Sequence, residues 1–233
     1  MLDLKQRTVG GIELLEVPGD KEGSHIIFFH GYGANAFDLL PLHRVYGEYP
    51  RPTWIFPHAP LKVRFSEEYE GKAWFPIDMT LLHEAFREND FDKILQAFPP
   101  QIEEARKAGE HLIEELNIPL SNLFLGGFSQ GAVLATEIAL NAETSPGGLV
   151  ILSGSLFNPH LWEELAPAHD GLSFFQSHGR RDPLLPFQSA VALNKLLVKA
   201  GWESHFHPFD GGHEIPSSIL HSLQNYFRIC LAS

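Results

Sequence analysis

The segment GGFSQGA, residues 126–132, carries the pattern Gly-x-Ser-x-Gly with Ser129 at its centre. In a chain of this composition, the five-residue pattern arises by chance in roughly one sequence in ten, so its surroundings must decide between a nucleophile and an ordinary turn. The apolar run NLFLGG precedes the serine, and the almost entirely apolar segment QGAVLATEIALN follows it. A strand, a tight turn and a buried helix in this order present a serine hydroxyl at the top of a sheet. The segment therefore predicts a sharp strand–turn–helix elbow with Ser129 at the turn.

The two glycines of the pattern, Gly127 and Gly131, have a steric reason for their positions. The sharp bend brings the backbones of the strand and the helix too close for a side chain at either position. The same bend holds the serine in a strained conformation at a helix N-terminus, whose partial positive charge favours an oxyanion. We therefore interpret Ser129 as a nucleophile.

Short apolar runs separated by glycine or proline turns alternate along the chain with segments of helical periodicity. Strands are expected at residues 24–29, 53–56, 122–127, 148–154, 172–179 and 204–209, and helices at 91–116, 187–201 and 215–231. Pro99 and Pro100 must kink or restart the first of these helices. The alternation predicts one α/β domain over residues 1–233, with a mainly parallel, doubly wound sheet and helices on both faces. A hairpin between residues 11–17 and 24–29 is expected to add antiparallel edge strands.

The composition restricts the partners of the chain. Its 233 residues include 17 basic and 29 acidic side chains, for a formal net charge of −12 without a basic run, which argues against nucleic acid or an anionic membrane as a partner. The N-terminal segment MLDLKQRTVGG lacks the apolar core of a secretory signal, and no apolar run is long enough to cross a membrane. The single cysteine, Cys230, fits a reducing compartment. We expect a cytoplasmic protein with a small-molecule substrate and no membrane insertion.

A serine nucleophile needs a base and an acid, which in this architecture follow it in the order serine, acid, histidine. Asp182 lies in the turn GRRDPLLP after an expected strand, and Asp210 is the alternative acid. His213 lies in the loop DGGHEIP after the last expected strand, where a base could approach the serine. His178, at the end of an expected strand, is the competing base, although it precedes Asp182. We favour the set Ser129, Asp182 and His213.

These roles predict a mechanism and two further site residues. His213 would take the proton of Ser129, and Asp182 would fix the tautomer of the imidazole. The tetrahedral oxyanion would need two backbone donors, one of which is the N–H of Gln130, directly after the nucleophile. The loop HGYGAN follows the strand at residues 24–29, and it places the N–H of Tyr32 as the second donor.

Three histidines offer an alternative, a metal site. His205 and His207 lie on one face of the last expected strand, and His213 follows a few residues later. Three imidazoles could bind zinc, but strand histidines are more often structural, and His213 already has the role of base. We therefore expect neither a metal nor an organic cofactor.

A series of motifs occurs in order along the chain: FFHGYGAN, FPHAP, GKAWFPID, LGGFSQGA, GLVILSG, HGRRDPLLP and GGHEIP. In this combination the sequence resembles the phospholipase/carboxylesterase family of α/β-hydrolases, which includes the acyl-protein thioesterases. The resemblance covers nearly the whole chain. It implies the α/β-hydrolase fold, catalysis by Ser129, Asp182 and His213, and an oxyanion hole formed by the backbone of Tyr32 and Gln130. It also allows a homodimer, since members of the family are often dimers.

The early loop bears on the substrate class. Thioesterase members of this family usually carry an aspartate in the pattern HGxGD, where this chain has Ala34 followed by Asn35. The chain is more similar to bacterial-type carboxylesterases, which implies hydrolysis of short- to medium-chain carboxylic esters through an acyl-enzyme on Ser129. The alternative is an acyl-protein thioesterase or lysophospholipase with long-chain acyl substrates. An inactive hydrolase fold used as a binding module is a third hypothesis.

Residues 61–89 form an insert in which we expect the substrate pocket to be built. Its apolar side chains stand among acidic ones and are Phe65, Tyr69, Trp74, Phe75, Met79, Leu81, Leu82 and Phe86. On one interpretation they line an acyl channel, and on the other they are the core of a long loop. Trp74, together with Phe75, is the predicted wall of the substrate site.

Overall fold

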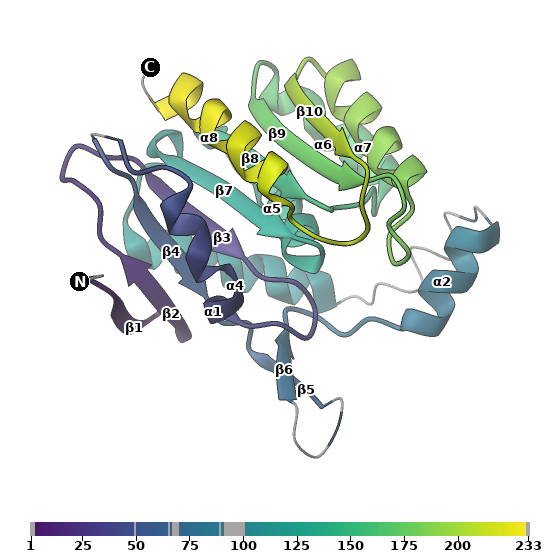
Figure 1. The fold of residues 1–233 in the computed structure, drawn as a ribbon, viewed down its shortest axis with the longest axis horizontal. Coiled ribbons are helices and arrows are strands. Elements are labelled where there is room, and N and C mark those ends of the chain that lie inside the picture. The colour runs from purple at the N-terminus through teal and green to yellow at the C-terminus, as the bar shows by residue number, and fades with distance from the viewer. Residues whose placement is uncertain are drawn as a thin grey trace.

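The computed structural model describes residues 3–48, 50–64, 66, 70–88, 90 and 101–231. An eight-stranded sheet forms the centre of the fold, in the order β1-β2-β4-β3-β7-β8-β9-β10 (Figure 1). Its strands are β1 (Lys5–Val9), β2 (Ile12–Val17), β3 (His25–Phe29), β4 (Thr53–Pro57), β7 (Leu123–Phe128), β8 (Gly148–Leu152), β9 (Ser173–Gly179) and β10 (Glu203–Phe209). All pairs from β4 to β10 are parallel. The predicted α/β fold with a mainly parallel sheet is confirmed.

The antiparallel part of the sheet differs from the expectation. β1 and β2 form the hairpin, through a turn in which Gly10 and Gly11 both have positive φ, 54° and 78°. β2 then pairs antiparallel with β4, whereas β3 lies between β4 and β7. The predicted hairpin between residues 11–17 and 24–29 is therefore wrong. The exposed, polar sequence of β1, KQRTV, gave no apolar alternation from which the strand could be predicted.

Helices cover both faces of the sheet. The helices of the described ranges are α1 (Ala36–Leu39), α2 (Met79–Glu88), α4 (Gln101–Leu116), α5 (Gln130–Asn141), α6 (Pro159–Leu165), α7 (Phe187–Lys199) and α8 (Ser217–Leu231), with 3₁₀ helices at Leu40–Arg44, Leu120–Asn122 and Ala166–His169; α2 belongs to the insert rather than to the two layers. α4 begins directly after Pro99 and Pro100, at which a restart was predicted; residues 91–100 of the expected helix lie outside the described residues. Within the described ranges, no helix is both long and apolar enough to cross a bilayer.

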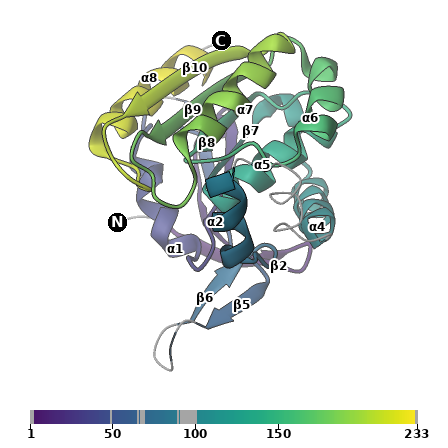
Figure 2. The ribbon, with the colours of Figure 1, turned by 90° about the vertical axis from the view of Figure 1, so that its right-hand side faces the viewer.

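Alternate residues of the buried strands face opposite helical layers. Ile26 and Phe28 of β3 pack into the core formed with α1 and α8, while Ile27 and Phe29 pack into the core formed with α4, α5, α6 and α7. Figure 2 shows these two layers on either side of the sheet. Every residue of α5 from Gln130 to Leu140 is buried, because this helix packs across the centre of the sheet. The helix that follows the serine is therefore held rigidly.

The insert at residues 61–89 leaves the body of the domain and returns to it. β5 (Leu61–Arg64) and β6 (Glu70–Ala73) form a separate antiparallel pair that projects from the body (Figure 2), and α2 follows. The base of β6 is attached to the body, since Lys72 forms a β-bridge with Ala34. Phe65 and Tyr69 of the predicted pocket lie outside the described residues.

Candidate active site

Ser129 lies at the sharp junction between β7 and α5. Its backbone has φ 56° and ψ −118°, a conformation that strains any residue with a Cβ. A Cβ at Gly127 would overlap the backbone of Gly131, and a Cβ at Gly131 would overlap the carbonyl of Phe29. The predicted close approach at both glycines is confirmed. The strand, the strained serine and the buried helix form the elbow that the sequence predicted.

A cavity of about 300 Å³ opens beside the elbow, and Ser129 and His213 both line it. The remaining lining residues are Gly31, Tyr32, Ala34, Ile77, Leu82, Phe128, Gln130, Val133, Leu184 and Leu185. Most of these side chains are apolar, and none of those described is a carboxylate, a lysine or an arginine. The cavity therefore suits an uncharged, largely apolar ligand.

His213 and Asp182 form a hydrogen-bonded pair at this cavity. The Nδ1 of His213 lies 2.6 Å from Oδ2 of Asp182. Because an ionised carboxylate only accepts hydrogen bonds, Nδ1 carries the proton and Nε2 is the basic nitrogen. The Asp182 side chain is 0% exposed and that of His213 is 12% exposed, so the pair is shielded from water while the imidazole still reaches the cavity.

Hydrogen bonds hold Asp182 in its ionised form. Burial raises the pKa of this carboxyl, but the bonds from His213 and from the backbone of Leu185 and Leu184 lower it, and the result is a pKa below the usual range. The N–H groups of Leu184 and Leu185 both donate to Oδ1, at 2.9 Å each. Asp182 is therefore positioned to orient the imidazole and to stabilise its charged form.

The alternative acid and base occupy other positions. The side chain of Asp210 is 80% exposed and lies 3.5 Å from Arg181 on the surface. His178 is completely buried and is absent from the described lining of the cavity. The structure thus brings Asp182, rather than Asp210, to His213, and places His213, rather than His178, at the cavity with Ser129.

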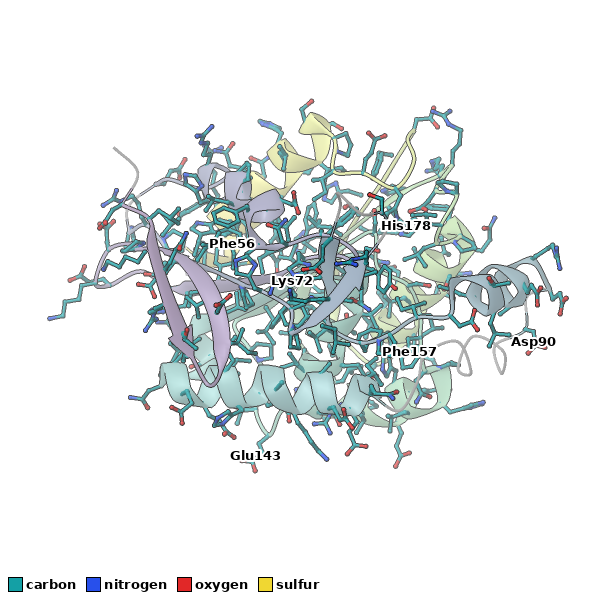
Figure 3. The ribbon with its side chains drawn as sticks, turned by 90° about the horizontal axis from the view of Figure 1, so that it is seen from below. Phe56, Lys72, Asp90, Glu143, Phe157 and His178 are labelled. Atoms are coloured by element: carbon teal, nitrogen blue, oxygen red, sulfur yellow. The ribbon has the colours of Figure 1, made fainter. Side chains whose placement is uncertain are left out.

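His178, whose position is labelled in Figure 3, nevertheless contacts the same carboxylate, a role that sequence reasoning missed. Its Nε2 lies 2.8 Å from the carbonyl oxygen of Leu185 and 3.3 Å from Oδ2 of Asp182. Both oxygens are acceptors, so Nε2 carries a proton. Burial is the largest of the effects that lower the pKa of His178, and it keeps the imidazole neutral. Asp182 thus contacts two imidazoles. The contact with His178 could not be predicted from the sequence, in which His178 simply precedes Asp182 by four residues.

The two predicted oxyanion donors lie at the same cavity as the serine. Tyr32 follows β3, which is the direct neighbour of β7, and Gln130 is the first residue of α5. The N–H groups in the first turn of a helix have no carbonyl acceptor within the helix. The N–H of Gln130 therefore points outward from the N-terminus of α5. Tyr32 and Gln130 therefore lie where the oxyanion hole was predicted, and their role stays a prediction.

Trp74 and Phe75 are placed differently from the predicted wall of the substrate site. They are 3% and 0% exposed and do not belong to the described cavity lining. The indole N–H of Trp74 donates to the carbonyl of His30 at 2.8 Å, and its ring meets that of Phe29 edge to face at 5.1 Å. Ile77 and Leu82 of the same insert line the cavity instead. A substrate-binding role for Trp74 and Phe75 thus receives no support from the geometry.

The three histidines of the alternative metal site each contact a different residue. The ring of His205 packs against Tyr226 at 5.2 Å, that of His207 stacks on Phe175 at 4.9 Å, and His213 is bonded to Asp182. Across the part of the chain that the structure describes, no group of three or more histidine, cysteine or acidic side chains is arranged so that it could hold a metal ion.

His30, in the loop before Tyr32, should make stability depend on pH. Its Nδ1 donates to the carbonyl of Gly31 at 2.8 Å and its Nε2 accepts from the N–H of Ala59 at 3.1 Å, so both nitrogens are satisfied in the neutral ring. Burial is the main cause that lowers the pKa of His30 from 6.5 to about 4. Acid therefore protonates the unfolded chain first, and stability that is present above pH 6.5 is lost as the pH falls toward 4.

We expect the pH dependence of unfolding to be reduced when His30 is replaced by glutamine. The imidazole should account for about 3 kcal/mol of the stability lost between pH 7 and pH 4. Urea unfolding of the wild type and His30→Gln at several pH values measures the difference, with His160→Gln, at an exposed position, as the control for loss of an imidazole. Equal pH dependence in the wild type and His30→Gln would contradict the assignment.

Comparison with known proteins agrees with the fold. A family model described as Phospholipase/Carboxylesterase matches residues 11–231. Acyl-protein thioesterase 1 of Eremothecium gossypii is 29% identical over 201 residues, which cover 83% of this chain and 82% of the relative. A probable carboxylesterase of Oryza sativa subsp. japonica is 26% identical, over 88% of this chain and 77% of the relative.

The fold is shared with solved esterases. The crystal structure of esterase PE8 superposes with a TM-score of 0.78 over 98% of this chain and 99% of that protein, at 21% sequence identity. At this identity the likeness is one of fold. The family model, which spans nearly all of the sequence, shows that the chain belongs to the phospholipase/carboxylesterase family of α/β-hydrolases.

Proposed function

We propose that this member of a family of ester and thioester hydrolases is a serine carboxylesterase that hydrolyses short- to medium-chain esters through an acyl-enzyme on Ser129. One observation carries the proposal. Ser129 and His213 line one cavity, and His213 is hydrogen bonded on its far side to Asp182 at 2.6 Å. The strained elbow at Ser129 and the apolar lining of the cavity support the same assignment.

The proposed reaction has two steps, acylation of Ser129 and hydrolysis of the acyl-enzyme, and both use the same groups. The Nε2 of His213 takes the proton of the Ser129 hydroxyl as Oγ attacks the carbonyl carbon of the ester. The carbonyl oxygen becomes an oxyanion between the N–H groups of Tyr32 and Gln130. Collapse of this intermediate breaks the bond to the alcohol, which leaves with the proton from His213. Water then attacks the acyl-enzyme by the same route, and the carboxylic acid and free Ser129 are released.

The size and lining of the cavity support short or medium acyl chains. Its volume of about 300 Å³ lies at the lower end of the range for small-molecule pockets. Ile77, Leu82 and Val133 offer apolar contact to an acyl chain, and the described lining has no cation that would bind a charged group. A neutral ester with a compact acyl group therefore matches this site better than a long-chain lipid.

The second candidate is a thioesterase or lysophospholipase with long acyl chains. The similarity to acyl-protein thioesterase 1 of Eremothecium gossypii favours it. The same serine chemistry would serve both candidates, because a thioester carbonyl is attacked in the same way. The acyl-chain length that the enzyme accepts therefore separates them.

We expect hydrolysis of p-nitrophenyl esters to peak at short or medium chains and to fall beyond about eight carbons, where the acyl chain outgrows the cavity. The measurement is kcat/KM across the series from acetate to palmitate. Replacing Ile77, which is half-buried and lines the cavity, by alanine should shift the optimum toward longer chains.

Leu81→Ala is the matched control for this variant. Leu81 lies in the same insert and is also half-buried, but it is not part of the described lining. It should leave the optimum where it is in the wild type. A wild-type profile that rises toward palmitate would favour the long-chain candidate and contradict the proposal.

A further inference from the structure

Residues 71–75, the end of β6 and the two residues that follow it, touch both chain segments that would supply the oxyanion donors. The two segments are far apart in sequence, since Tyr32 follows β3 and Gln130 begins α5. Neither segment pairs with β6 as part of the central sheet. Five hydrogen bonds nevertheless join residues 72–75 to these segments, three to residues 30–34 and two to Gln130.

The first set of contacts lies on either side of Tyr32. The N–H of Gly33 donates to the carbonyl of Lys72 at 2.8 Å, and the N–H of Lys72 donates to the carbonyl of Ala34 at 2.9 Å. Figure 3 labels Lys72. The approach is so close that a Cβ at Gly71 would overlap the carbonyl of Gly33. On the other side of Tyr32, the indole N–H of Trp74 donates to the carbonyl of His30 at 2.8 Å.

The second set of contacts is made by the side chain of Gln130. Its Oε1 accepts from the backbone N–H of Trp74 at 2.9 Å, and its Nε2 donates to the carbonyl of Phe75 at 2.7 Å. Gln130 is 3% exposed, so these bonds are shielded from water. The amide thus fastens the start of α5 to the same short segment that fastens the loop around Tyr32.

We infer that residues 71–75 and the amide of Gln130 form an oxyanion clamp, which fixes the backbone N–H groups of Tyr32 and Gln130 relative to each other. The inference rests on the proposed function. An oxyanion hole works only if both donors are held within about 2.7–3.1 Å of one oxygen position before the reaction begins. Trp74 and the side chain of Gln130 are accordingly positioning residues. The buried indole of Trp74 acts on the site by holding the loop that contains Tyr32.

Two variants test the clamp without altering a backbone donor. Gln130→Met removes both amide hydrogen bonds and keeps a side chain of similar length. Trp74→Phe removes the indole N–H and keeps an aromatic ring against Phe29. We expect kcat to fall by about 10- to 100-fold, somewhat less than the effect of removing a donor outright, with KM within about twofold of the wild type. The inhibition constant of a trifluoromethyl ketone, whose hemiketal oxygen occupies the oxyanion hole, should rise in parallel.

The chain offers a closely matched control for each variant. Trp202 is also 3% exposed and donates its indole N–H to a backbone carbonyl, that of Ala166, at 2.8 Å. Gln176 is also buried, and its amide bonds to the carbonyl of Ala190 at 2.8 Å and to Asn194 at 3.0 Å. Trp202→Phe and Gln176→Met should lower the melting temperature as much as the clamp variants do, but leave kcat and the ketone inhibition near wild-type values.

The outcomes separate the clamp from the proposed function. Suppose that the wild type hydrolyses the ester, and that Gln130→Met and Trp74→Phe have the same kcat and the same ketone inhibition constant as the wild type. This result would overturn the clamp but not the proposed function. An equal loss of kcat in the two control variants would also overturn it, since the effect would then be one of general stability. Absence of ester turnover in the wild type would overturn the proposed function, and the clamp with it. A loss of kcat and of ketone affinity confined to the clamp variants supports the inference.

Discussion

Replacing Ser129 by alanine should reduce kcat for p-nitrophenyl ester hydrolysis by a factor on the order of 10⁶, the size of effect that loss of a triad serine produces. In the proposed mechanism this hydroxyl is the group of the protein that forms a covalent bond to the acyl carbon of the substrate. Its removal leaves the cavity, the His213–Asp182 pair and the oxyanion donors in place. KM should therefore change little, and the protein should remain folded.

Ser153 offers a control in a similar backbone setting. It also has positive φ, 49°, and follows β8, the strand beside β7. Its hydroxyl is buried and has no hydrogen-bond partner among the described residues, and Ser153 does not belong to the described cavity lining. Ser153→Ala should retain turnover within a few-fold of the wild type. If Ser129→Ala kept more than about one hundredth of the wild-type kcat, the residual activity would contradict an acyl-enzyme on this serine.

Replacing Asp182 by asparagine should lower kcat by about 10⁴-fold, because it reverses the tautomer of His213. The two backbone N–H groups of Leu184 and Leu185 face Oδ1 of Asp182, so the amide oxygen of an asparagine would take that position. The NH₂ group would then face Nδ1 of His213 and donate to it. The imidazole would then have to carry its proton on Nε2. A protonated Nε2 could not accept the proton of Ser129 and so could not act as the base.

The control for this variant is Asp210→Asn, at the acid that the sequence left as the alternative. Its side chain is 80% exposed and pairs with Arg181 at the surface. The substitution should leave kcat near the wild-type value. A loss of activity in Asp210→Asn comparable to that in Asp182→Asn would show that the acid had been wrongly assigned.

Much of the site could be predicted because its signals are local. The elbow is determined by five consecutive positions, and the structure shows the steric reason for the glycines on either side of Ser129. Asp182 lies in the loop after β9 and His213 in the loop after β10, the last two strands of the parallel part of the sheet. Since the carboxyl ends of parallel strands meet at one edge of the sheet, their chain order was enough to bring them together.

What the sequence did not reveal depends on pairings across long distances in the chain. β1 is exposed and polar, so no apolar alternation marked it, and the partner of β2 followed from sheet topology alone. Trp74 looked like a substrate contact because aromatic residues in an insert often line pockets. Its actual partners are the carbonyl of His30 and the amide of Gln130, 44 and 56 residues away, and such side chain-to-backbone bonds leave no periodic pattern.

The most direct test of the proposed acyl-enzyme is to locate the residue that reacts. The wild type would be treated with an alkyl fluorophosphonate, which traps an activated serine, and the modified peptide would be identified by mass spectrometry. We predict a single adduct, on Ser129, with labelling that abolishes ester hydrolysis in proportion. Labelling of another residue, or full hydrolysis after complete modification of Ser129, would contradict catalysis through this serine.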